Sequence, residues 1–107
     1  MGIRSTPDFE EWLRTLRDQR ARAKVLSRID RLALGNPGDV KPVGEGVSEM
    51  RIDSGPGYRV YIVQRGNDIV LLLGGDKSSQ QRNIKRAKQL ATEARDEDKT
   101  IRRSGTS

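Results

Sequence analysis

The sequence predicts an α+β domain in which two N-terminal helices pack on one face of an antiparallel sheet and a C-terminal helix follows, in the order β-α-α-β-β-β-α. Apolar residues recur at helical spacing before residue 35 and again after residue 78. Between residues 47 and 75 they alternate or run continuously instead, as in strands. The length of 107 residues suits one domain. We place that domain at residues 1–95 and expect the polar, aperiodic segment 96–107 to be a disordered tail.

The N-terminal helices have recognisable starts and apolar faces. Residues 2–5 are a candidate edge strand, Thr6 is a candidate N-cap, and Pro7 takes the first helical position. The apolar face of the first helix consists of Phe9, Trp12, Leu13 and Leu16. A second stripe predicts the second helix and consists of Val25, Leu26, Ile29, Leu32 and Ala33.

Three strands are predicted at residues 47–52, 58–65 and 69–75, joined by glycine-containing turns. The last strand, IVLLLGG, is a continuous apolar run, which is typical of a sheet centre. Gly74 and Gly75 are expected to let this strand turn sharply into the C-terminal helix. Because the helices are expected on one face, the opposite face of the sheet is left open for another use.

Composition favours a polyanionic partner and excludes several kinds of chemistry. The chain has 21 basic and 15 acidic residues, a net charge of +6 and a pI near 10.2, which suits nucleic acid or another acidic surface. It contains no cysteine and no histidine, so disulfides, thiolate chemistry and the commonest general base are excluded. No apolar run reaches about 18 residues and no signal peptide is visible, so a cytoplasmic protein is expected.

Three cations are candidates for phosphate chemistry. Arg51 and Arg59 lie on the strand face opposite the apolar one, and Lys77 follows the neighbouring strand. Together they can stabilise the negative charge that develops when phosphorus is attacked. The alternative is that they are ordinary solvated surface charges. Asp76 is the nearest candidate metal ligand, but no second carboxylate accompanies it, so neither a metal nor a cofactor is expected.

Three further residues are candidate RNA contacts. Tyr61 shares the face of Arg59 and can stack on a base, or it can simply cover the sheet. Arg28 and Arg31 lie on the basic face of the second helix. That face can bind an RNA backbone, or it can be the usual solvated side of an amphipathic helix.

Two segments resemble the RelE/ParE toxin superfamily, in particular its HigB-like "addiction module killer protein" branch. They are FEEWLRTL and VSEMRIDSGPGYRVYIVQRGNDIVLLLGGDKSSQQRNIKRAKQLA, and the resemblance runs from Thr6 to Glu93. It implies a RelE-like fold. It also implies that Arg59 matches the family's phosphate-binding arginine, that Lys77 is a candidate proton donor to the leaving oxygen, and that Arg51 matches a basic position on the preceding strand.

The chain departs from the RelE pattern at two places. Asp53 stands near the position of a second basic residue on the preceding strand. The tyrosine that RelE has in its last helix is absent, and Gln80, Gln81 and Asn83 lie there instead.

The resemblance implies the toxin of a type II toxin–antitoxin module. The expected activity is a ribosome-dependent mRNA endonuclease that inhibits translation. Two alternatives remain: a ParE-like, non-catalytic DNA gyrase inhibitor, and a degenerate member that binds only its antitoxin and operator DNA. The expected partners are a helix-turn-helix antitoxin encoded nearby, the ribosome and mRNA, with operator DNA reached only through the antitoxin complex and no membrane.

Overall fold

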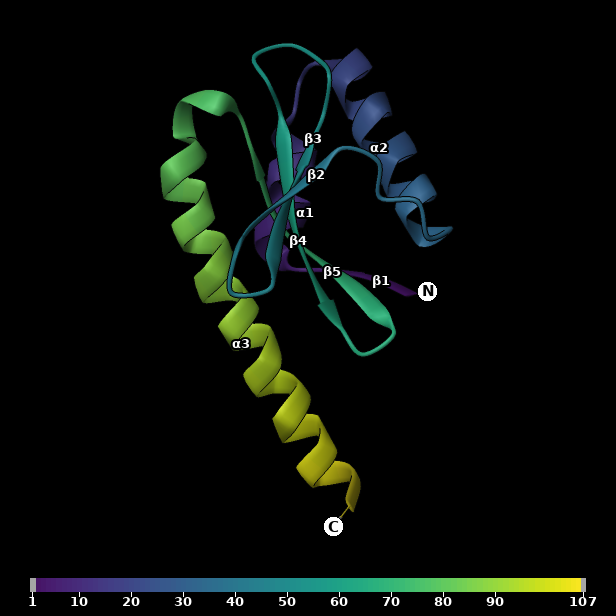
Figure 1. Ribbon diagram of the computed structural model, residues 1–107, viewed down its shortest axis with the longest axis vertical. Helices are drawn as coiled ribbons and strands as arrows, with labels where there is room; N and C mark the ends of the chain where they lie inside the picture. The colour runs from purple at the N-terminus through teal and green to yellow at the C-terminus, as the bar shows by residue number, and fades with distance from the viewer. Residues whose placement is uncertain (1, 107) are drawn as a thin grey trace.

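In the computed structural model, one five-stranded sheet lies between helices on both of its faces (Figure 1). The structure describes residues 2–106, and side chains only for residues 2–94. The elements in chain order are β1 (Gly2–Ser5), α1 (Pro7–Thr15), α2 (Gln19–Ala33), β2 (Val40–Gly44), β3 (Val47–Arg51), β4 (Arg59–Arg65), β5 (Asp68–Gly75), a 3₁₀ turn η1 (Lys77–Ser79) and α3 (Gln80–Thr106). The predicted tail, residues 96–107, lies outside the described side chains and stays a prediction.

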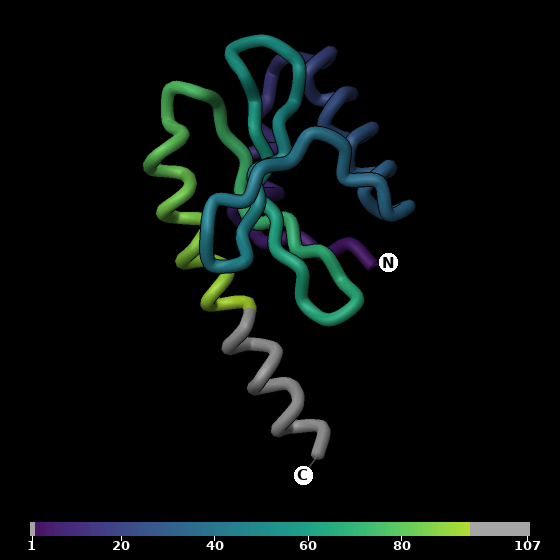
Figure 2. The backbone as a smooth tube through the Cα atoms, viewed as in Figure 1, coloured from purple at the N-terminus to yellow at the C-terminus, as the bar shows by residue number. Residues whose placement is uncertain are grey.

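The sheet confirms the predicted α+β class and corrects its details. Its strand order is β1-β5-β4-β3-β2, and β1 runs parallel to β5, so the sheet is mixed and not purely antiparallel. Figure 2 shows the N-terminal strand beside the β4–β5 hairpin, although the two are far apart in the sequence. β2 was missed because it is a mostly exposed edge strand that contains Pro42, a residue that an edge strand tolerates.

One face of the sheet is covered by α1 and α2, as the two apolar stripes predict. Thr6 caps α1: its hydroxyl accepts a hydrogen bond from the Phe9 amide at 3.0 Å and donates one to the Leu72 carbonyl at 2.6 Å. This pair of bonds ties the start of α1 to β5. Leu26, which we placed in the buried stripe, is instead 42% exposed. The buried core on this face comprises Phe9, Val25, Leu32, Met50, Ile52, Val60, Ile62, Ile69 and Leu71.

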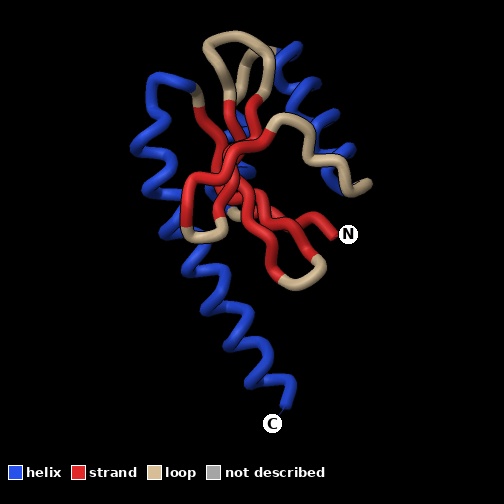
Figure 3. The backbone as a smooth tube through the Cα atoms, viewed as in Figure 1, coloured by secondary structure: helices blue, strands red, loops and turns tan. Residues whose placement is uncertain are grey.

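The opposite face is not open, because α3 packs on it (Figure 3). Ala87, Leu90 and Ala91 of α3 are buried in this second core. The strand residues of this core are Val47, Tyr61, Val63, Val70 and Leu72. Arg51 at the end of β3 and Arg59 at the start of β4 lie at one end of this face, next to this core.

The two glycines at the end of β5 allow close packing on both faces of the sheet. A Cβ at Gly74 would lie 2.1 Å from Cε3 of Trp12, and a Cβ at Gly75 would lie 1.9 Å from Nδ2 of Asn83. Both glycines belong to the strand, so the expected sharp turn at these positions is wrong. The turn begins at Asp76, whose side chain caps η1.

Candidate functional site

The register of β3 and β4 brings four polar side chains onto one face of the sheet. Arg51 pairs with Arg59, and Glu49 pairs with Tyr61. Residues two apart on a strand share a face, so all four side chains project toward the side that α3 covers. Arg59 also pairs with Gly75 at the end of β5. The site therefore lies at the end of the sheet where β3 ends, β4 begins and β5 ends.

Lys77 lies beside Arg59 because both contact the loop before β4. The Lys77 amide donates a hydrogen bond to the Pro56 carbonyl at 3.4 Å. A Cβ at Gly57 would lie 3.2 Å from Nη1 of Arg59 and 3.4 Å from Cβ of Lys77. Gly57 also has φ of +79°, which favours glycine. The structure thus places Arg51 beside Arg59 and the backbone and Cβ of Lys77 near the loop that Arg59 contacts, and the side chain of Lys77 is exposed.

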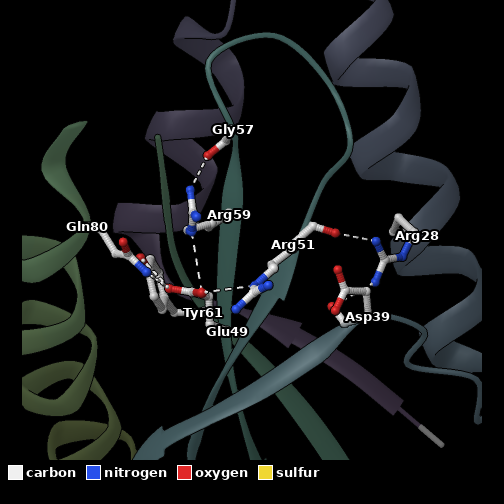
Figure 4. A network of polar contacts seen from close by, with 8 residues as sticks. All are labelled: Arg28, Asp39, Glu49, Arg51, Gly57, Arg59, Tyr61 and Gln80. Carbon is white, nitrogen blue, oxygen red and sulfur yellow. Dashed lines mark hydrogen bonds and ion pairs between the residues drawn. The ribbon is translucent and has the colours of Figure 1, made fainter. Parts of the chain in front are cut away.

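The centre of the site is Glu49, a fully buried carboxylate (Figure 4). Its Oε2 accepts hydrogen bonds from Gln80 Nε2 at 2.9 Å and from the Tyr61 hydroxyl at 3.3 Å. Its Oε1 lies 3.3 Å from Arg59 Nε and 3.6 Å from Arg51 Nε. These two contacts are ion pairs by distance. Neither Glu49 Oε1 nor Arg59 Nε has a hydrogen-bond partner among the described residues, because the geometry of these contacts does not fit a hydrogen bond. We did not single out Glu49 from the sequence; its only signal there is that it shares a strand face with Arg51.

The two arginines differ in their exposure. The side chain of Arg51 is 45% exposed, whereas that of Arg59 is only 12% exposed. Arg59 Nη1 also donates a hydrogen bond to the Gly57 carbonyl at 2.6 Å. The expectation that Arg59 lies on an open sheet face is therefore wrong, because Glu49 and the loop at Gly57 enclose most of its guanidinium.

Tyr61 is fully buried in the core beneath α3. The expectation that its ring is available to stack on a base is therefore wrong for this structure, and the alternative, that it covers the sheet, is correct. Burial raises the pKa of the Tyr61 hydroxyl well above its usual value, and the charge of Glu49 with its hydrogen bond raises that pKa further.

We expect the buried Tyr61 hydroxyl to make the protein less stable at high pH. Below about pH 10 the hydroxyl is neutral in both the folded and the unfolded chain. Above that pH the unfolded chain loses the proton while the folded chain keeps it, so the free energy of unfolding falls as pH rises, by up to about 1.4 kcal/mol per pH unit. Urea titrations of the wild type and of Tyr61→Phe measure this. Parallel pH curves for the two proteins would contradict it.

Arg28 and Arg31 of α2 do not project into the site. Arg28 donates hydrogen bonds to three backbone carbonyls, those of Arg51, of Pro37 at 2.9 Å and of Asp39 at 3.3 Å. Its guanidinium therefore joins α2 to the end of β3 and to the loop before β2, as Figure 4 shows. Arg31 is exposed on the surface of α2.

The two positions at which the chain departs from RelE have structural roles. Gln80 takes part in the Glu49 network, and Asn83 Nδ2 donates to Ser79 Oγ at 2.7 Å. The Asp53 carbonyl accepts a hydrogen bond from Lys24 Nζ at 2.5 Å, so this contact uses the backbone of Asp53 and not its carboxylate.

Asp76 serves the backbone of the turn. Its Oδ1 accepts hydrogen bonds from the amide and the hydroxyl of Ser78, which lower the pKa of the carboxyl. Among the described residues, no group of three or more acidic, histidine or cysteine side chains lies close enough to hold a metal ion. Within the same part of the chain, no helix is long and apolar enough to cross a membrane.

Comparisons with known proteins give one family and one curated relative. The family model described as "Phage derived protein Gp49-like" matches residues 11–96. A Haemophilus influenzae protein described as uncharacterized is 52% identical over 92 residues, which cover 85% of this chain and 93% of the relative. No solved structure matches the chain.

Proposed function

Because the chain belongs to the Gp49-like family, which is of the RelE/HigB toxin type, we propose that it is the toxin of a type II toxin–antitoxin pair and cleaves mRNA on the ribosome. The observation that carries the nuclease proposal is that Arg51 lies opposite Arg59 at one end of the sheet, with the Cβ of Lys77 near the loop that Arg59 contacts. Cleavage would inhibit translation and arrest growth. An antitoxin, a helix-turn-helix protein by the family resemblance, would hold the toxin inactive.

The proposed reaction is an intramolecular transesterification of RNA. The ribose 2′-oxygen forms a bond to the adjacent phosphorus, and the bond from phosphorus to the 5′-oxygen breaks. Solvent takes the proton of the 2′-hydroxyl, and Lys77 gives a proton to the leaving 5′-oxygen. Arg51 and Arg59 stabilise the added negative charge on the phosphate oxygens. The products are a 2′,3′-cyclic phosphate and a 5′-hydroxyl.

The proposal keeps Arg31 as a contact to the RNA backbone outside the site, because its side chain is exposed on α2. Tyr61 and Arg28 are left out of the RNA contacts. Tyr61 is fully buried, and the Arg28 guanidinium is engaged with three carbonyls.

One observation favours a second candidate function, a ParE-like protein that inhibits DNA gyrase without catalysis. Arg59 is 12% exposed and faces a buried carboxylate, as a structural ion pair does. A gyrase inhibitor needs no cation aimed at a phosphate. Under this candidate Arg51 and Lys77 would be surface charges.

The test compares mRNA cleavage by the wild type, Arg51→Ala and Lys77→Ala in a translating extract, with the cut ends mapped. Both side chains are exposed, so their removal should leave the fold intact. Each charged hydrogen bond to the reacting phosphate contributes about 1.5–3 kcal/mol, so each variant should cut roughly 10- to 160-fold more slowly.

The matched control is Lys85→Ala, which removes an exposed cation of α3 and should leave cleavage unchanged. Unchanged cleavage by the Arg51→Ala/Lys77→Ala double variant would refute the assignment of these residues. Intact mRNA together with gyrase-dependent DNA breaks would support the second candidate.

A further inference from the structure

We infer that Glu49 is a positioning residue: its buried carboxylate sets the direction of the Arg59 guanidinium and lets Arg51 and Arg59 lie side by side. The importance of this for cleavage rests on the proposed nuclease function, but the positioning of Arg59 itself does not. Glu49 is fully buried, so it cannot touch a substrate in this structure and must act through the arginines.

The two oxygens of the Glu49 carboxylate have different contact partners. Oε2 is anchored by Gln80 and Tyr61, one from the start of α3 and one from β4. Oε1 faces the Nε atoms of Arg59 and Arg51. The anchored oxygen fixes the plane of the carboxylate, and the other oxygen then presents negative charge to both guanidinium groups.

Arg59 is consequently held by one hydrogen bond, at Nη1, and by the ion pair on its Nε side. Nε lies 3.3 Å from Glu49 Oε1, and Nη1 donates to the Gly57 carbonyl at 2.6 Å. A guanidinium is planar, so the hydrogen bond at Nη1 and the attraction of Glu49 on the Nε side together restrict the direction of Nη2. A phosphate-binding group fixed in this way needs little rearrangement when charge develops on the phosphate.

The charge of Glu49 also counters the repulsion between the two arginines. Arg51 and Arg59 are directly opposite in the β3–β4 register, and like charges in that arrangement destabilise a sheet. With Glu49 between them the three side chains carry a net charge of about +1, and without its charge they would carry about +2. The positive charge seen by a phosphate is therefore lower than two arginines alone would give.

Glu49→Gln tests this inference because it keeps the shape and one carbonyl oxygen but removes the charge. We expect cleavage to fall at least tenfold, because Arg59 loses its fixed direction. We expect binding of RNA to become no weaker, and the slope of log affinity against log salt to steepen by about 0.7 because one more net positive charge faces the backbone. A purely structural role would weaken binding and cleavage together.

The first measurement uses the full chain without RNA: hydrogen exchange at the Arg59 Nε–H, followed by ¹⁵N NMR. We expect at least tenfold faster exchange in Glu49→Gln than in the wild type. Glu45→Gln, at the exposed β2–β3 turn, is the matched control and should not change the exchange rate of the Arg59 Nε–H.

The second measurement is binding of a non-cleavable RNA that lacks the reacting 2′-hydroxyl, titrated at several salt concentrations. Cleavage of the corresponding unmodified RNA on ribosomes is the third.

Unchanged Arg59 Nε–H exchange in Glu49→Gln would overturn the inference, whether or not the protein cuts RNA. A parallel loss of binding and cleavage would overturn it as well. Faster exchange in a protein whose wild type cuts no RNA would support the positioning of Arg59 and reject the proposed nuclease. If Glu49→Gln does not fold, Glu49→Asp replaces it. This variant keeps the negative charge but shortens the side chain by one methylene. The inference then requires faster exchange of the Arg59 Nε–H in Glu49→Asp than in the wild type.

Discussion

Replacing Arg59 with alanine is expected to slow mRNA cleavage by about 10²–10³-fold and to lower the free energy of unfolding by about 3 kcal/mol. The rate effect follows from the loss of a cation aimed at the phosphate. The stability effect follows from Glu49, because the change leaves this buried carboxylate with only the Arg51 ion pair at 3.6 Å and the donors on Oε2. Removing one partner of a buried ion pair costs about 3–5 kcal/mol, and the remaining partners place this case at the low end.

Two variants separate the effect on rate from the effect on stability. Arg59→Lys keeps the charge near Glu49, so it should restore most of the stability but only part of the cleavage, since an ammonium lacks the planar fork. The double change Arg59→Met/Glu49→Gln removes both buried charges, so it should recover stability without recovering cleavage. Urea unfolding and ribosome-dependent cleavage are measured on each purified protein. Full cleavage by Arg59→Ala would rule out its role at the phosphate.

The alternation of strand residues was sufficient to place Arg51 and Arg59 on one face of the sheet. It could not predict what covers that face. Tyr61 is buried because α3 packs over β4, and this contact joins parts of the chain that alternation within one strand does not relate. The same helix contributes Gln80 to Glu49 across 31 positions of sequence. The alternation of residues along each strand therefore predicted which side chains share a face of the sheet. The packing of α3 on that face determines which of these side chains are exposed.

The glycines of β5 show a similar limit. A Gly-Gly pair before a helix is compatible with a sharp turn, and the sequence contains no sign of the aromatic ring that requires Gly74 to lack a side chain. That ring belongs to Trp12, which lies on the first helix, and it meets Gly74 because α1 packs on β5. Thr6, by contrast, was predicted correctly as a cap because helix caps depend on neighbouring residues only.

Arg28→Ala is expected to lower the free energy of unfolding by about 2 kcal/mol, because hydrogen bonds from a charged donor contribute about 1.5–3 kcal/mol each and these three are exposed, which weakens them. Arg28 donates to the carbonyls of Arg51, Pro37 and Asp39, so its loss should loosen the loop before β2 and the end of β3. Amide hydrogen exchange should rise at residues 36–40 and 51–53. Cleavage should fall as well, because the end of β3 carries Arg51.

Arg31→Ala is the matched control, since it removes an equally basic residue one helical turn later on α2. Arg31 is exposed, so its removal should change the free energy of unfolding by no more than about 0.5 kcal/mol.

The variants Arg28→Ala and Arg31→Ala also test the prediction from the sequence that both residues contact RNA. If both contact the RNA backbone, each change should weaken RNA binding and reduce the salt slope by about 0.7. We expect this reduction for Arg31→Ala alone, because the guanidinium of Arg28 is already occupied by the backbone. An equal reduction in slope for Arg28→Ala, with unchanged stability, would show that Arg28 binds RNA and does not hold the end of β3.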